Sequence, residues 1–298
     1  MAALPIDHFS PIALPELVAE AELLTRVDRK YLLDRCQAGD FLRHCDPDTR
    51  VLAIEGGRSF RYESVYFDTP DLLSYHQAAH ARRHRFKVRT RSYLDSRLAF
   101  LEVKVRGDRE VTVKDRIDHD PASPERLDEA GRDYVDRTLL ERGLAGSVAA
   151  LLAPTLVTRY RRITLLPEPG VRVTVDTDLF WSPPTADQVS HENHFLPHNA
   201  AGRHLGQPER LSGRTCTAAD HGGGPEGLSR PDLVIVETKS GARPSDIDRL
   251  LWRSGHRPLS ISKYGTGLAA LRRDLPANKW ARILRHHFRT TEELPCAA

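Results

Sequence analysis

The segment FKVRTRSYLDSRLAFLEVKVRGDREVTVKDR, residues 86–116, alternates polar and apolar side chains at the two-residue period of a β-strand. It predicts three antiparallel strands whose polar faces carry Lys87, Arg89 and Arg91, then Glu102, Lys104 and Arg106, then Glu110, Thr112, Lys114 and Arg116. A solvated sheet face gives the same alternation. Like charges directly opposite each other are destabilising, however, so neighbouring basic strands favour an anion between them.

The rest of the chain repeats this pattern in five further segments. Strands are predicted at 26–33, 60–68, 156–166, 171–176 and 232–239. Eight antiparallel strands suffice for a small closed barrel with room for side chains and one ligand. We therefore predict an α+β fold, a closed antiparallel eight-stranded β-barrel forming a tunnel, with helices packed outside. One such helix is expected at 123–143, with Ser123 as its N-cap.

Composition restricts the class of protein. Formal charge is only +3, from 44 basic and 41 acidic residues, which argues against a general nucleic-acid binder. The four cysteines form no C-x-x-C pair, and neither a signal peptide nor a run of about 18 apolar residues is evident. These features predict a cytoplasmic protein. We expect one domain over 1–298, with a long loop or partly disordered insertion at 182–231 and a C-terminal helix and tail at 276–298.

The basic side chains on the polar faces are the candidate site. They are Lys30, Arg89, Arg91, Lys104, Lys114, Arg162, Arg172 and Lys239. Many desolvated cations would be costly without a partner, so an interior lined by them must be wet and suited to a polyanion. Arginine forks match phosphate oxygens, and lysines add point charge. The carboxylates Glu102, Glu110, Asp176 and Glu237 could hold a divalent metal against phosphate.

Seven motifs in order resemble one family. They are RVDRKY at 26–31, FKVRTR at 86–91, LEVKVRGDREVTVKDR at 101–116, TRYRR at 158–162, VRVTVDTDL at 171–179, VIVETKS at 234–240 and SISKYGTG at 260–267. Together they resemble the VTC domain, the catalytic domain of polyphosphate polymerases within the triphosphate tunnel metalloenzyme superfamily. Each motif alone is short, and their order makes the resemblance specific.

The resemblance implies transfer of the terminal phosphoryl group of ATP to a growing polyphosphate chain, with Mn²⁺ or Mg²⁺. The residues that then look like catalytic phosphate ligands are Lys30, Arg89, Arg91, Lys104, Arg162 and Arg172. Ser262 and Lys263 resemble a pair at the far wall, with Lys263 a further catalytic candidate and Ser262 a substrate-binding one. Glu237 resembles the metal-holding carboxylate, and Tyr160 a substrate-binding neighbour of the nucleotide. Lys114, and Lys239 by its place on a polar face, are further substrate-binding candidates. ATP and inorganic polyphosphate are the expected partners, nucleic acid is not, and a membrane-protein partner in trans stays open.

Three alternatives remain. A hydrolase of tripolyphosphate or nucleoside triphosphate could use the same fold; such relatives typically begin with Glu-x-Glu-x-Lys, where this chain has RVDRK at 26–30. A non-catalytic module could bind polyphosphate or RNA, although a carboxylate at Glu237 favours an enzyme. A merely solvated charged face would respond little to polyanions.

Overall fold

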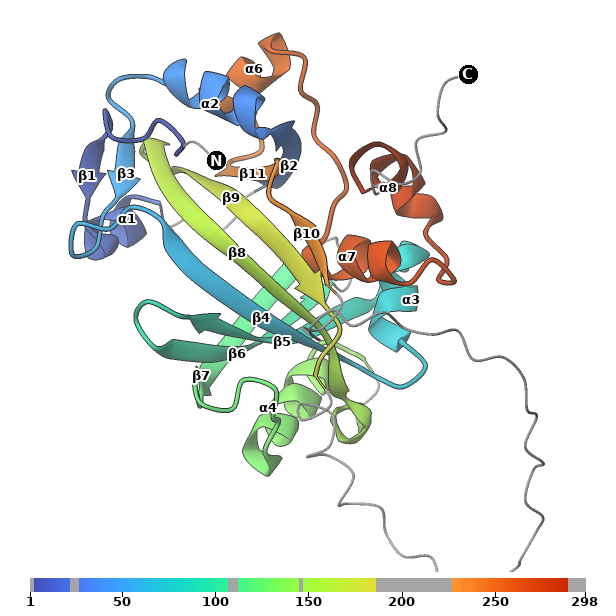
Figure 1. The fold of residues 1–298 in the computed structure, drawn as a ribbon. Coiled ribbons are helices and arrows are strands. Elements are labelled where there is room, and N and C mark those ends of the chain that lie inside the picture. The colour runs from blue at the N-terminus through green and yellow to red at the C-terminus, as the bar shows by residue number, and fades with distance from the viewer. Residues whose placement is uncertain (1–2, 22–26, 107–111, 145–146, 186–226, 289–298) are drawn as a thin grey trace, which may run out of the picture.

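The fold is built on one large, strongly curved antiparallel sheet (Figure 1). The computed structural model describes residues 3–21, 27–106, 112–144, 147–185 and 227–288. The main path of the sheet runs β2-β11-β9-β8-β4-β5-β6-β7. Its strands are β2 (Val27–Asp34), β4 (Phe60–Asp68), β5 (Arg85–Tyr93), β6 (Leu98–Arg106), β7 (Thr112–His119), β8 (Ala153–Glu168), β9 (Val171–Ser182) and β11 (Leu233–Ser240). Three short strands, β1 (Ser10–Ile12), β3 (Arg50–Leu52) and β10 (Leu228–Arg230), attach to this path.

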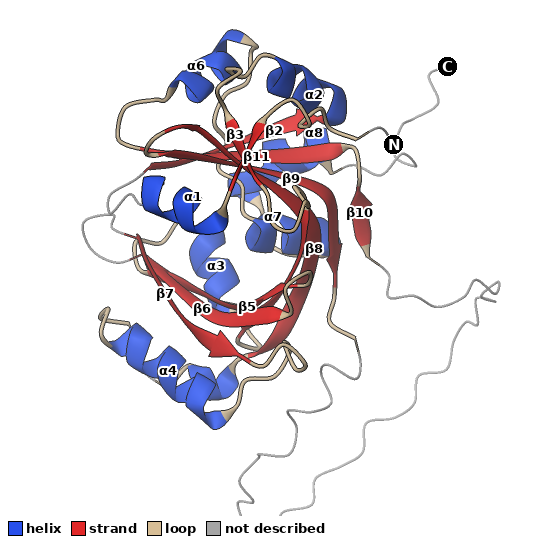
Figure 2. Cartoon of the chain, turned by 90° about the vertical axis from the view of Figure 1, so that its left-hand side faces the viewer, coloured by secondary structure: helices blue, strands red, loops and turns tan. Residues whose placement is uncertain are grey.

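The predicted closure into an eight-stranded barrel is wrong. The eight predicted strands form the path, but within the described residues no pairing joins β2 to β7, so the sheet is open (Figure 2). Part of β2 is instead occupied by the segment after α6, because the Leu259 N–H donates a hydrogen bond to the Lys30 carbonyl at 2.7 Å. Desolvation first, and then Lys30 on β2, lower the pKa of Lys104 on β6, so closure would bring like charges closer.

Helices cover both faces of the curved sheet. The helices are α1 (Leu14–Glu20), α2 (Arg35–Arg43), α3 (Leu73–Ala79), α4 (Glu129–Leu140), α6 (Asp246–Arg253), α7 (Lys263–Leu271) and α8 (Ala281–His287), with the 3-10 turns η2 (Ala149–Leu151) and η3 (Asn278–Trp280). On the convex face, α2 and α6 pack over β2, β9 and β11, while α4 packs over β5 and β6. On the concave face, α3, α7 and α8 pack at one end. The concave face is therefore part apolar core and part polar site.

The alternation of the strands decides which side chains reach each core. Val88, Val103 and Val236 are fully buried on the convex face beneath the helices. Their sequence neighbours point the other way, because successive side chains of a strand alternate. The basic side chains thus share the concave face, as the sequence pattern predicts.

The predicted cap of α4 is wrong. The helix begins at Glu129, and Asp128 is its N-cap in place of Ser123. The Asp128 side chain accepts a hydrogen bond from the Gly131 N–H at 2.7 Å. The Thr90 hydroxyl donates to the Pro124 carbonyl at 2.6 Å, which ties the segment before the helix to β5 in a turn conformation. A long-range contact thus overrides the local capping signal.

Two predicted segments fall partly outside the described residues. Within 182–231, residues 186–226 are not described, and β10 pairs with the far end of β9. Within 276–298, η3 and α8 are described and residues 289–298 are not.

Candidate phosphate-binding site

The first cluster on the concave face joins β4, β5 and β6. Glu102 is only 2% exposed and accepts hydrogen bonds from Arg89 Nε at 2.9 Å and Nη2 at 2.7 Å. Arg91 lies 3.6 Å from the second oxygen of the same carboxylate. Arg89 also donates to the Tyr66 hydroxyl at 3.0 Å. One carboxylate therefore orients two guanidinium groups and leaves a net positive charge.

The second cluster joins β8, β9 and the start of α7. Asp176 is 1% exposed and accepts from Arg162 Nε at 2.6 Å and Nη2 at 2.8 Å, and it also pairs with the Lys263 ammonium. Burial would raise the pKa of Asp176, but Arg162 and Lys263 outweigh it and lower that pKa to about 2. Asp176 stays ionised at neutral pH and holds two cations in place.

The third cluster lies where β2, β11 and β9 meet. Glu237 pairs with Lys30 across the β2–β11 register and with Lys239 on its own strand, each at 3.7 Å. Burial would raise the pKa of Glu237, but Lys239 and Lys30 hold it well below its usual range. Arg172 on β9 stands directly opposite Lys239. This carboxylate is again outnumbered by cations.

A fourth group lies at the end of the concave face formed by β5 and β6. Lys87 Nζ donates to the Ser262 hydroxyl at 2.8 Å, and Lys30 Nζ donates to the Ile261 carbonyl at 3.4 Å. Lys104 is exposed and stands directly opposite Lys87. Burial and the neighbouring cations, Lys30 and Lys104 first, lower the pKa of Lys87 well below its ordinary value.

Tyr160 connects the first two clusters. Lys263 Nζ lies 4.4 Å and the Arg162 guanidinium 5.3 Å from the centre of its ring. Burial would raise its pKa, but Arg91, Arg162 and Lys263 outweigh burial and lower it. Among the residues the structure describes, its buried hydroxyl has no hydrogen-bond partner. A polar substrate group could supply that partner.

The structure thus brings almost all the predicted site residues to one face. Residues that reach it are Lys30, Arg89, Arg91, Lys104, Tyr160, Arg162, Arg172, Glu237, Lys239, Ser262 and Lys263. Lys114 stands opposite Lys104 in the β6–β7 register, but its side chain lies outside the description. The sequence reasoning placed Lys87 on the right face without selecting it as a site residue, and it missed that Asp176 pairs with Arg162.

The carboxylates do not gather as a metal-binding group. Glu102 and Asp176 are each paired with arginine in separate clusters, and Glu110 lies outside the described residues. In the described part of the chain, no group of three or more His, Cys, Asp or Glu side chains could hold a metal ion. Mg²⁺ in phosphate sites needs only one or two carboxylates, because water and substrate phosphates supply the other ligands. Glu237, partly exposed beside Lys30, fits that role.

Comparison with known proteins identifies the family. The family model of the VTC domain matches residues 25–272, so the chain belongs to the VTC domain family. A search of curated proteins found no match. Within the described residues, no helix is both long and apolar enough to cross a membrane.

Solved structures with a similar course of the chain share little sequence with it. A Hippeastrum protein assigned to the adenylyl cyclases, with a reported dominant triphosphatase activity, is 14% identical with a TM-score of 0.43, covering 85% of this chain and 99% of that one. A Vibrio parahaemolyticus protein assigned to the adenylate cyclases is 9% identical with a TM-score of 0.39, covering 83% and 99%. The PH1819 protein of Pyrococcus horikoshii is 10% identical with a TM-score of 0.39, covering 83% and 98%. At these values the likenesses carry no argument about activity.

Proposed function

We propose that this protein is an ATP-dependent polyphosphate polymerase that transfers the terminal phosphoryl group of ATP to an inorganic polyphosphate chain. The observation that supports the proposal most directly is the convergence of basic side chains from β2, β5, β6, β8, β9, β11 and α7 on one concave face of a VTC domain. Each carboxylate there is outnumbered by cations. The face therefore has charge left over for a polyanion, which the solvated-surface alternative does not explain.

The reaction needs no nucleophile from the protein. An anionic terminal oxygen of the polyphosphate chain attacks the γ-phosphorus of ATP, a new P–O bond forms, and the bond to the β-phosphate oxygen breaks with its electron pair leaving on ADP. Catalysis is then positioning and stabilisation of charge on the transferred group. Arg89, Arg91 and Arg162 are oriented by Glu102 and Asp176, so their remaining N–H groups are arranged before the substrate arrives.

A divalent ion, Mn²⁺ or Mg²⁺, would be held by Glu237 together with substrate phosphate oxygens. Bound there, it would neutralise charge on the transferred phosphoryl group. Lys30 and Lys239, which flank Glu237, would bind the oxygens that the ion leaves free. Tyr160, with its free hydroxyl, would contact the same triphosphate.

A second candidate function is hydrolysis of ATP or tripolyphosphate by water. The observation that favours it is the open sheet, because within the described residues no strand pairing joins β2 to β7 and the strands do not enclose the concave face as a closed barrel would. The two functions require the same phosphate ligands and differ in the acceptor.

The product assay separates these functions. Purified protein incubated with ATP and Mn²⁺ should yield long polyphosphate on a gel together with ADP. Free phosphate without polymer would instead establish hydrolysis. Binding of tripolyphosphate without either product would leave a non-catalytic polyanion-binding module and sink the enzymatic proposal.

Affinity for tripolyphosphate should fall as pH rises through about 8. Glu237 raises the pKa of Lys239, but burial, Arg162 and Arg172 outweigh it and lower that pKa from 10.5 to about 8. A bound anion favours the charged lysine, so binding at pH 8 should take up protons. Titration calorimetry from pH 7 to pH 9, in buffers of different ionisation enthalpy, measures both effects.

Lys239→Arg is the matched control for this pH dependence. Arginine stays charged throughout this range, so the variant should show a shallower fall in affinity. The effect of pH on folding stability has the opposite sign. Because the pKa of Lys239 is lowered in the folded protein, its charge destabilises the fold below pH 8. This loss of stability disappears as the pH rises from about 8 to the ordinary lysine pKa of 10.5. An affinity that rises with pH would contradict the assignment.

A further inference from the structure

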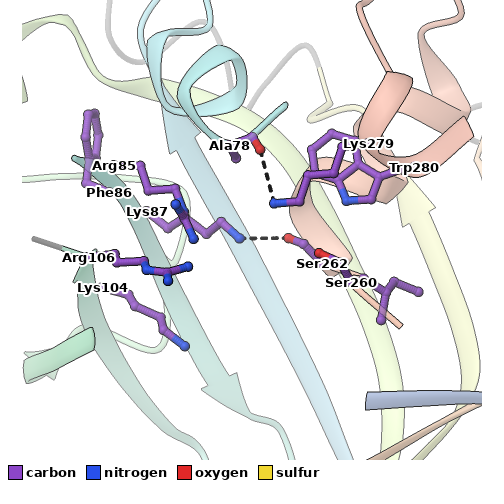
Figure 3. Close-up of a pocket in the computed structure, with 11 residues that line it drawn as sticks. Ala78, Arg85, Phe86, Lys87, Lys104, Arg106, Ser260, Ser262, Lys279 and Trp280 are labelled. Carbon is purple, nitrogen blue, oxygen red and sulfur yellow. Dashed lines mark hydrogen bonds between the residues drawn. The ribbon is translucent and has the colours of Figure 1, made fainter. Parts of the chain in front are cut away.

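The first turn of helix α7 fixes the places of two predicted site residues, Ser262 and Lys263. Ser262 is the N-cap of the helix, and its side chain accepts a hydrogen bond from the Gly265 N–H at 3.2 Å. It also lines a cavity of about 200 Å³, in which it faces Lys87 (Figure 3). The side chain of Lys263 instead reaches β9, where it pairs with Asp176. The position of this turn therefore sets the geometry of both side chains.

Two tryptophans pack against the backbone of α7. Trp181 Nε1 donates a hydrogen bond to the Lys263 carbonyl at 2.9 Å. A Cβ at Gly267 would lie 2.2 Å from the Trp181 ring, and a Cβ at Gly265 would lie 2.3 Å from the Trp280 ring. Contacts this short are essentially never seen for a real Cβ, so both positions need the close approach that glycine permits. The glycines of the motif at 260–267 therefore serve this close packing.

Tyr264 is the buried polar contact of the same turn. The residue is only 1% exposed, and its hydroxyl donates a hydrogen bond to Asp68 at the end of β4. Asp68 is also 1% exposed and accepts from the backbone N–H groups of Ser74 and Tyr75, in the first turn of α3, at 2.8 Å each. Burial raises the pKa of Asp68, and the Tyr264 hydroxyl is the first of the donors that oppose this rise. Tyr264 thus joins α7 to the junction of β4 and α3.

The ring of Tyr264 also reaches the first cluster of the site. It stacks on the Tyr66 ring, with 5.1 Å between the ring centres and 24° between the ring planes. The Tyr66 hydroxyl in turn accepts a hydrogen bond from Arg89 at 3.0 Å. Because Tyr264 is buried and its hydroxyl is bound to Asp68, it is placed to act through its neighbours and not on the substrate itself.

We propose that Tyr264 is a positioning residue that holds Lys263 in place to bind the triphosphate of the substrate. The inference rests on the proposed function for the identity of that ligand. A lysine ammonium is a point charge on a flexible stem, so its location depends on the backbone that carries it. Tyr264 is the next residue in the chain, and its bond to Asp68 fixes that backbone. Lys263 then lies 4.4 Å from the centre of the Tyr160 ring, inside the site.

The test is a double-mutant cycle on the binding of tripolyphosphate, measured without ATP or metal. Lys263→Ala should lower the affinity about tenfold or more, as expected for the loss of one charge-assisted contact. Tyr264→Phe keeps the ring but removes the hydroxyl, and it should lower the affinity about threefold to tenfold, the range that one hydrogen bond supplies. In the Lys263→Ala background, Tyr264→Phe should cause no further fall, because the side chain through which it acts is gone. In an Arg89→Ala background, the fall should persist.

Tyr31→Phe is the matched control. Tyr31 is also a fully buried tyrosine that donates to a buried aspartate, Asp248, at 2.7 Å, but it lies on the convex face beneath α6. This variant should lower the melting temperature as Tyr264→Phe does, yet leave the affinity for tripolyphosphate unchanged. Asp68→Asn disturbs the Tyr264 contact from its other side and should reproduce the loss of affinity.

Four results would overturn the positioning role. They are an unchanged affinity in Tyr264→Phe, an equal fall in Tyr31→Phe, a fall that persists in the Lys263→Ala background, and a fall that disappears in the Arg89→Ala background. If the product assay yields no polymer but the coupling of Tyr264 to Lys263 persists, the proposed reaction fails and the positioning role stands. If polymer forms but the two substitutions act independently, the reaction stands and the positioning role fails.

Discussion

Glu237→Gln is expected to lower the rate of phosphoryl transfer by about two orders of magnitude or more while leaving tripolyphosphate binding intact. The substitution keeps the size of the side chain but removes the charge with which Glu237 would hold a divalent ion. Metal stabilisation of transferring phosphate contributes several kcal/mol, and each ~1.4 kcal/mol is a factor of ten in rate. Lys30 and Lys239 would lose their carboxylate partner, so polyanion affinity should stay equal or rise.

Steady-state turnover with ATP and titrated Mn²⁺, alongside tripolyphosphate binding without metal, measures the two effects separately. Glu63→Gln is the matched control, because Glu63 pairs with Arg159 and both belong to the face of β4 and β8 opposite the site. That variant should retain normal turnover. Metal-dependent synthesis that continues unchanged in Glu237→Gln would show that Glu237 does not hold the ion.

Glu102→Gln is expected to destabilise the ligand-free protein by about 3 kcal/mol, because breaking a buried ion pair strands its partner charge. Arg89 and Arg91 would keep their charges on the concave face without the carboxylate that neutralises them. An amide oxygen can still accept one hydrogen bond from Arg89, so the fold should survive. Urea unfolding midpoints with and without tripolyphosphate provide the measurement.

Tripolyphosphate should restore much of the stability that Glu102→Gln loses, since phosphate oxygens can replace the carboxylate as hydrogen-bond acceptors for Arg89 and Arg91. The variant should therefore show a larger ligand-induced rise in stability than the wild type. Asp95→Asn breaks the exposed pair with Arg61 and should cost less than about 1 kcal/mol with no change in the ligand effect. If both variants lost the same stability, Glu102 would not be acting as a buried counter-ion.

The strand pattern was predictable because a half-buried strand shows its burial directly in its sequence. Residues 86–116 alternate so regularly that Val88 and Val103 fall in the core, and Arg89 and Lys104 fall on the opposite face. The same alternation marked the other strands of the path. Local capping was less reliable, because the contact between Thr90 and Pro124 decides where α4 begins.

The pairing of charges across strands was harder to predict. Asp176 meets Arg162 only in the register of the β8–β9 pair, and that register shifts at two irregularities. One shift coincides with a bulge in β9, where Asp178 has a φ of 52° and where Asp176 and Leu179, three residues apart, both face the concave side. Lys279 offered still less signal, because it lies 192 residues beyond Lys87 in the chain and lines the same cavity as Lys87 only through η3.

The amino-acid sequence alone determined that many strands carry basic side chains on one face, since side-chain alternation is a property of each strand by itself. It also determined membership of the VTC domain family through the order of its motifs. Only the tertiary structure decided that the sheet stays open between β2 and β7, and which carboxylate orients which arginine. Both depend on the register and curvature of strands distant in the chain, where repulsion between facing cations competes with backbone pairing.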